Sequence, residues 1–173
     1  MRLPVEQRAA TATVGHFPSP RLGWSVTAGG ILGGQIDGRD VSGGGTLVGT
    51  LSWLPVYEHS TRPFVAFTAS FGGAFARALS DDQMTHSYWA LDARGGVTVG
   101  KTFAGRWVPY ASARVFGGPV HWQHAGADVS GNDRYHFTVG GGLIVRLPRS
   151  VDATLEGMPL GEKSVALGVT LHL

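Results

Sequence analysis

Apolar and polar side chains alternate through most of this chain, and this alternation constrains the fold more than any other feature. Side chains of a β-strand point alternately to the two faces of a sheet, so a period of two residues predicts strands. In the segment 46–54, Leu51 and Trp53 fall on one face, and Thr50 and Ser52 fall on the other. No segment keeps the period of about 3.6 residues that marks an amphipathic helix. We therefore predict an all-β protein.

Prolines and polar clusters divide the alternating pattern into eight segments of 8 to 14 residues. A meander of antiparallel strands loses its exposed edges when it closes, and strands of this length match the ~9–11 residues that cross a bilayer at a tilt. The pattern predicts an eight-stranded antiparallel up-and-down transmembrane β-barrel over 21–173. Residues 1–20 lack the alternation, so a flexible periplasmic N-terminal segment is expected there. The predicted strands are 22–32, 46–54, 64–73, 87–99, 107–117, 134–147, 151–158 and 164–173.

Two closed barrels share this pattern: a soluble lipocalin-like barrel with its apolar face inward, and a membrane barrel with its apolar face outward. Charged residues make up only 15 % of the chain, and the lysines Lys101 and Lys163 fall in connections. The polar face consists mainly of Gly, Ser, Thr and Ala, whereas a strand face exposed to water usually carries Lys and Glu. Small side chains suit the crowded interior of an eight-stranded barrel. The apolar face is therefore expected to contact lipid.

Composition excludes several other classes of protein. The net charge is +2 and the basic residues are scattered, whereas a nucleic-acid-binding face needs clustered Lys and Arg. No nucleic-acid partner is expected. The chain contains no cysteine, which excludes a disulfide scaffold, a zinc ribbon and thiol catalysis.

Aromatic residues fall near both ends of the predicted strands. Rings with an apolar body and a polar tip are favoured at the two lipid–water interfaces of a membrane barrel. The predicted membrane-interface aromatics are Trp24, Trp53 and Trp107 at one rim, and Trp89, Trp122 and Tyr135 at the other.

Charged residues on the polar face are balanced in sign. Charges in a narrow barrel are tolerated when they are paired and hydrogen-bonded, so a shared network of ion pairs is expected to plug the lumen. An open, water-filled pore is not expected with eight strands. The predicted lumen charge network comprises Asp92, Arg94, Arg114, His136, Arg146, Asp152 and Glu156.

The C-terminal segment 164–173 alternates to its last residue, and together with the overall pattern it resembles the small eight-stranded outer-membrane β-barrels of Gram-negative bacteria, the OmpA/OmpX-like group. The family usually ends in Phe or Trp, whereas this chain ends in Leu173. The resemblance implies an outer-membrane location and a mature form without its export signal. It also implies contact with lipid and lipopolysaccharide, recognition of the last strand by the outer-membrane assembly machinery, and extracellular loops that offer a surface to a protein partner.

The expected function is therefore a non-enzymatic one, structural or in surface interaction. No catalytic, cofactor-binding or metal-binding residue is predicted. Two alternatives stay open: a soluble lipocalin-like carrier, and a lipid A-modifying hydrolase or acyltransferase that would use Ser112, His136 and Glu156. His121 and His124 are spaced as two metal ligands could be, but a metal site would need further ligands.

Overall fold

The computed structural model describes residues 5–36, 39–79, 85–124, 127–132, 136–161 and 163–172. Within these ranges the chain forms eleven β-strands and no helix, so the predicted all-β class is confirmed. The strands are β1 (Val5–Ser19), β2 (Leu22–Ile36), β3 (Arg39–Val56), β4 (Phe64–Leu79), β5 (Thr85–Gly100), β6 (Trp107–Gly117), β7 (Pro119–His124), β8 (Ala127–Asn132), β9 (Phe137–Leu147), β10 (Val151–Gly161) and β11 (Ser164–Leu171).

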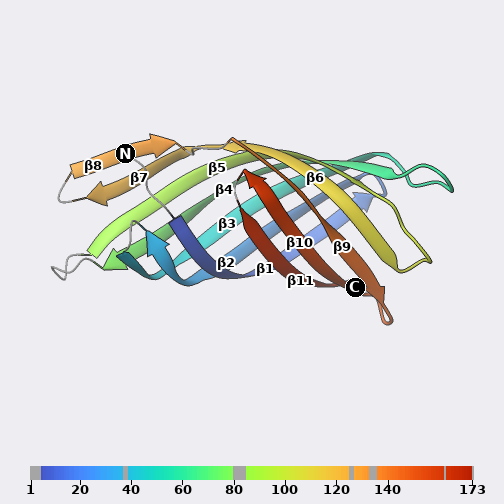
Figure 1. The fold of residues 1–173 in the computed structure, drawn as a ribbon, viewed down its shortest axis with the longest axis horizontal. Coiled ribbons are helices and arrows are strands. Elements are labelled where there is room, and N and C mark those ends of the chain that lie inside the picture. The colour runs from blue at the N-terminus through green and yellow to red at the C-terminus, as the bar shows by residue number, and fades with distance from the viewer. Residues whose placement is uncertain are drawn as a thin grey trace.

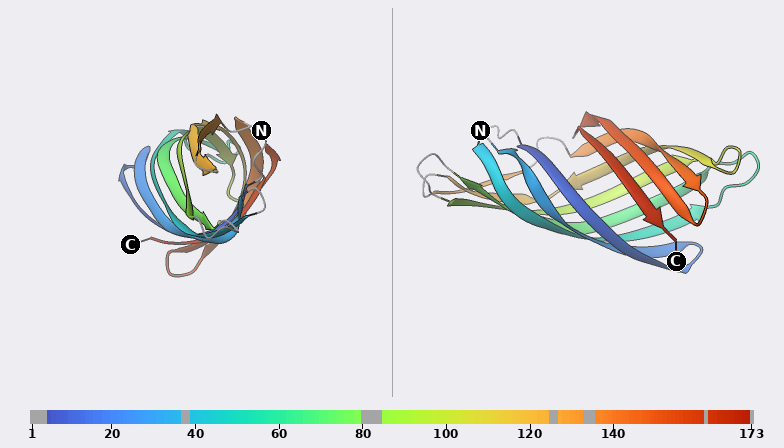
Figure 2. Two further views of the ribbon diagram at one scale, coloured as in Figure 1. Left: turned by 90° about the vertical axis from the view of Figure 1, so that its left-hand side faces the viewer. Right: turned by 90° about the horizontal axis from the view of Figure 1, so that it is seen from below.

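All strands belong to one antiparallel sheet in up-and-down order. The path through the sheet is β1-β2-β3-β4-β5-β6-β9-β10-β11, and a hairpin of β7 and β8 pairs with β5 beside it. The strands lie side by side and slant across the long axis of the molecule (Figure 1). Seen along that axis, the sheet curls into a half-barrel (Figure 2). In the described residues the sheet is open, because β1 pairs only with β2 and β11 only with β10.

The structure has more strands than the predicted eight. The first reason is that residues 5–19, which were expected to belong to a flexible N-terminal segment, form a strand. They form β1, which pairs with β2 in a register that sets Ala12 opposite Ala28 and Thr13 opposite Thr27. Thr11 and Thr13 fall on one face of β1, and Ala10, Ala12 and Val14 fall on the other, so the alternation is present but the small side chains give it a weak contrast in polarity. Backbone hydrogen bonds, which carry no sequence signature, hold this strand to the sheet.

A second difference lies in the predicted loop 118–133, which contains β7 and β8. Gly118 alone separates β6 from β7, and both strands pair with β5. A Cβ atom at Gly118 would collide with the carbonyl oxygen of Leu91, so a side chain is excluded between β6 and β7. This glycine ends the apolar alternation, but the chain continues beyond it as a strand.

The two faces of the sheet differ sharply in exposure. On β3, the side chains of Leu47 and Leu51 are 58 % and 61 % exposed, whereas their neighbours Val48 and Thr50 are half-buried. The most buried side chains lie on the same face as Val48 and Thr50, the concave one. They are Ile31, Ala76, Val108, Ser112, Phe116, Thr138 and Met158. The convex face is therefore apolar and exposed, and the concave face is largely polar.

Two connections at one end of the sheet are clamped together by hydrogen bonds. Thr102, in the β5–β6 connection, donates its backbone N–H to Oε1 of Glu58 at 2.7 Å and its hydroxyl to Oε2 at 2.6 Å. Lys101 donates its Nζ to the carbonyl oxygens of His59 at 3.3 Å and Ser60 at 2.8 Å. These bonds fix the β3–β4 connection against the β5–β6 connection.

The clamp predicts a pH effect on stability. Hydrogen bonds from Thr102 to the ionised carboxylate lower the pKa of Glu58 below its ordinary value of 4.5. This contribution to stability is present above the unfolded-state pKa and is lost as the pH falls through the lower folded-state pKa. We therefore expect the urea midpoint of the wild type to fall more than that of Glu58→Gln between about pH 6 and about pH 3. The exposed Glu6 in β1 offers the control Glu6→Gln, and equal acid sensitivity in wild type and Glu58→Gln would contradict the prediction.

Candidate functional site: the polar concave face

An ion pair crosses the concave face between two strands that are not neighbours. Arg114 on β6 donates from Nη2 to Oε2 of Glu156 on β10 at 2.6 Å, and the Tyr110 hydroxyl donates to the same oxygen at 3.0 Å. Strand β9 lies between β6 and β10. Gly142 of β9 is the register partner of both Tyr110 and Glu156. A Cβ at Gly142 would lie 2.5 Å from the Tyr110 hydroxyl oxygen, so this glycine leaves the space that the contact needs.

A second ion pair lies within β5. The Nε atom of Arg94 donates to Oδ2 of Asp92, two residues earlier on the same strand. The guanidinium carbon of Arg94 lies 5.1 Å from the ring centroid of Phe116, its register partner on β6. The cation is thus held between a carboxylate and an aromatic face.

The remaining predicted network residues do not join these pairs. Asp152 on β10 accepts a hydrogen bond at 2.9 Å from Nε2 of His172, which sequence reasoning had not assigned to the network. His136 and Arg146 are exposed, and among the described residues neither forms an ion pair. The predicted single network is therefore divided into separate pairs.

Hydroxyl groups continue the polar face across β3, β4, β5 and β6. The Thr50 and Ser70 hydroxyl oxygens are 2.9 Å apart and hydrogen-bonded, and the Thr98 hydroxyl donates to that of Ser112 at 3.3 Å. These residues carried only a weak signal in the sequence, because Ser and Thr are common on any polar strand face.

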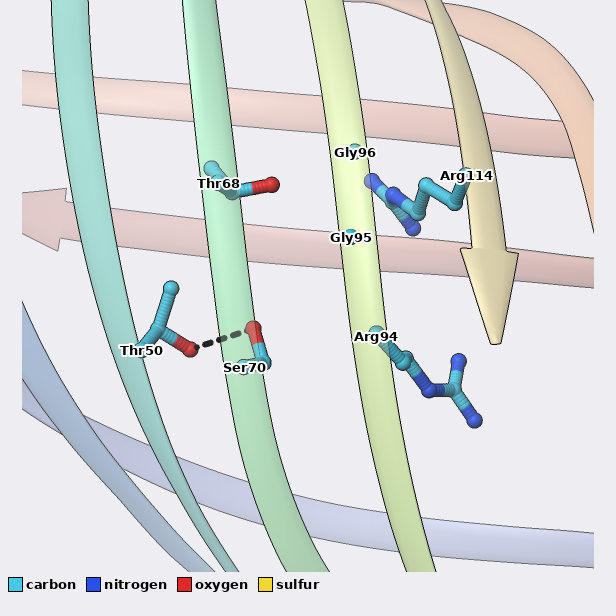
Figure 3. A pocket seen from close by; sticks show the side chains of 7 residues that line it. All are labelled: Thr50, Thr68, Ser70, Arg94, Gly95, Gly96 and Arg114. Carbon is cyan, nitrogen blue, oxygen red and sulfur yellow. Dashed lines mark hydrogen bonds between the residues drawn. The ribbon is translucent and has the colours of Figure 1, made fainter. Parts of the chain in front are cut away.

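A cavity of about 220 Å³ lies where the hydroxyl groups meet the arginines. Two register rows of the concave face bound it: Thr50, Ser70 and Arg94 in the first, and Thr68, Gly96 and Arg114 in the second. Gly95, from the row between them, also lines the cavity. Figure 3 shows the Thr68 hydroxyl and the Arg114 side chain pointing toward one another across Gly96. Both charged residues that line the cavity are cationic, and their carboxylate partners are not among its lining residues.

The predicted interface tryptophans lie toward the ends of the strands. Trp24, Trp53 and Trp107 lie at one end of the sheet with 45 %, 51 % and 47 % of their surface exposed, and the Trp53 ring stacks on Phe67 at 5.8 Å. Trp89, toward the other end, stacks on His121 with centroids 4.2 Å apart. Tyr135 and the side chain of Trp122 lie outside the described part of the structure.

Neither alternative chemistry is assembled in the described residues. No hydrogen bond there joins Ser112, His136 or Glu156 to another of the three, since Ser112 contacts Thr98 and Glu156 contacts Arg114 and Tyr110. The same residues contain no group of three His, Cys, Asp or Glu side chains that could hold a metal ion. They also include no helix long and apolar enough to cross a membrane.

Comparisons with protein-family models, with curated protein sequences and with solved structures find no match for this chain. The sheet and its two faces are therefore the features that indicate a function.

Proposed function

We propose that this chain is an integral outer-membrane protein of the OmpA/OmpX-like type, non-enzymatic, with its convex face against lipid and a plugged polar interior. The observation that carries the proposal is the exposure of large apolar side chains along that face. Leu47, Leu51 and Phe71 are 58 %, 61 % and 65 % exposed. A continuous apolar surface of this kind is costly in water, and it marks contact with a membrane or a partner.

Strand length and the paired polar face support the same proposal. Strands β2 to β5 have 15, 18, 16 and 16 residues, more than the ~9–11 needed to cross a bilayer. Their ends carry the exposed tryptophans expected at lipid–water interfaces. In a lipocalin-like carrier the polar side chains would lie on the convex outer face and the apolar side chains on the concave inner face.

Closure in a membrane requires that both sheet edges find partners, because unpaired backbone groups in lipid cost several kcal/mol each. Nine strands lie along the path, so β1 and β11 run in the same direction. If β1 leaves the edge, the strands from β2 to β11 along this path number eight, and β2 and β11 can pair antiparallel. The side chains of both edge strands are exposed, and β1 has the weaker alternation in polarity, so we take β1 as the strand that leaves. We propose this eight-stranded closure as the membrane form.

In the proposed setting the chain contacts phospholipid and lipopolysaccharide, and strand β11 is the segment offered to the outer-membrane assembly machinery. The extracellular connections offer a surface to a protein partner. We propose a structural or surface-interaction role in this setting.

Refolding into vesicles tests the proposal. Urea-unfolded protein, diluted into phospholipid vesicles, is expected to float with them, to resist extraction at alkaline pH and to give a strand-dominated circular dichroism spectrum. The chain lacking residues 1–20 is expected to insert equally well, because β1 is outside the proposed closed barrel. Cooperative folding in plain buffer with no vesicle association would contradict membrane insertion and favour the carrier. Failure of only the shortened chain would contradict the eight-stranded closure.

A further inference from the structure

The cavity over Gly96 has the donor pattern of an anion site. Arg114 uses Nη2 for Glu156, and its Nε and Nη1 groups have no acceptor among the described residues. A guanidinium carries five N–H donors in a fixed fork, which suits the oxygens of a small oxyanion. Thr68 adds a hydroxyl from the opposite side of the gap.

Glycine at position 96 creates the gap between these groups. Gly96 is the register partner of Thr68 on β4 and of Arg114 on β6. A Cβ at Gly96 would lie 2.8 Å from the Thr68 hydroxyl oxygen and 3.2 Å from Cγ of Arg114. The missing side chain therefore leaves a gap bounded by the Thr68 hydroxyl on one side and the Arg114 side chain on the other.

The charge of the lining residues and the volume of the cavity indicate which class of ligand it can bind. Arg94 and Arg114 are the charged residues that line the cavity, and their side chains are 38 % and 30 % exposed, so water reaches them. A volume of about 220 Å³ corresponds to roughly seven water molecules at ~30 Å³ each. That space holds one small anion with part of its hydration.

We propose that the Thr68–Gly96–Arg114 row binds a free small oxyanion such as phosphate or sulfate. The proposal depends on the concave face alone and holds whether or not the convex face meets lipid. The Arg114 fork supplies the charge, and Thr68 supplies an oriented hydroxyl donor.

Calorimetric titration of the folded protein with inorganic phosphate, at constant ionic strength maintained with NaCl, tests this site. The wild type is expected to show saturable binding, and Gly96→Ala is expected to weaken it at least tenfold by filling the gap. Gly49→Ala is the matched control, because Gly49 is exposed, does not line the cavity, and a Cβ there would meet only the carbonyl oxygen of Phe71 at an ordinary 3.8 Å. That variant is expected to bind phosphate within about twofold of the wild type.

Thr68→Val keeps the side-chain shape but removes the hydroxyl, so it tests the site even if Gly96→Ala fails to fold. A threefold or larger loss of phosphate affinity in Thr68→Val supports the proposal. Absence of saturable binding in the wild type would overturn it. Wild-type affinity in a folded Gly96→Ala variant, or in Thr68→Val, would also overturn it.

Discussion

Replacing Leu51 with arginine is expected to lower the free energy of unfolding from a bilayer by about 2–4 kcal/mol, the cost of a cation near mid-membrane on a lipid-facing strand. Leu51 lies on the convex face of β3, and 61 % of its surface is exposed. In the proposed orientation its side chain contacts hydrocarbon, which cannot solvate a guanidinium. Urea titration of vesicle-inserted protein, followed by tryptophan fluorescence, measures the loss.

The neighbouring substitution Thr50→Arg provides the control. Thr50 is half-buried on the concave face, where its hydroxyl is hydrogen-bonded to that of Ser70 at 2.9 Å. Loss of this bond costs about 1 kcal/mol, and the new guanidinium stays among polar groups. We therefore expect a smaller effect than at Leu51. A loss at Thr50 equal to or larger than that at Leu51 would mean that the facing is reversed.

The second large effect is expected at Glu156. Glu156→Gln leaves the Arg114 guanidinium without its carboxylate and alters the Tyr110 contact. Breaking a buried ion pair costs about 3–5 kcal/mol. Solvent reaches this pair, since the two side chains are 30 % and 16 % exposed, so we expect a loss of about 2 kcal/mol in the free energy of unfolding.

A double variant measures the interaction between Arg114 and Glu156 apart from the other contacts of each residue. Glu156→Gln combined with Arg114→Met is expected to cost less than the sum of the two single changes, because neither partner is left as an isolated charge. Asp152→Asn is the matched control, since its partner His172 is 57 % exposed and an exposed pair contributes little. Additive losses in the double variant would show that Arg114 and Glu156 are solvated independently.

The class of fold and the apolar outer face could be predicted from the sequence, because both depend on side chains that alternate in polarity. The period of two assigns Leu51 and Trp53 to one face, and the structure exposes both. The same rule missed β1, where the alternation of Ala with Thr gives only a weak contrast in polarity. It also missed β7 and β8, which follow Gly118. A strand whose two faces differ little in polarity is hard to detect from the sequence, because its side chains show little alternation.

The charged residues were predicted, but their pairing was not. Arg114 reaches Glu156 across an intervening strand, a contact that requires the register of three strands and the missing side chain of Gly142. Gly96 acts in the same way between Thr68 and Arg114. A glycine between two polar register partners is visible only after the strands are aligned, so a sequence alone indicates the residue types but not the site.

Spin labels at adjacent positions on β4 test the central claim, that the convex face contacts lipid, most directly. The chain has no cysteine, so Ala69→Cys and Ser70→Cys each give one label at a position of small side-chain volume. Ala69 is exposed on the convex face and Ser70 is half-buried on the concave face. In vesicles, the label at position 69 is expected to be accessible to lipid-soluble oxygen and protected from an aqueous nickel chelate. The label at position 70 is expected to be less accessible to oxygen than the label at position 69. High accessibility of the label at 69 to the nickel chelate, with low accessibility to oxygen, would contradict the claim.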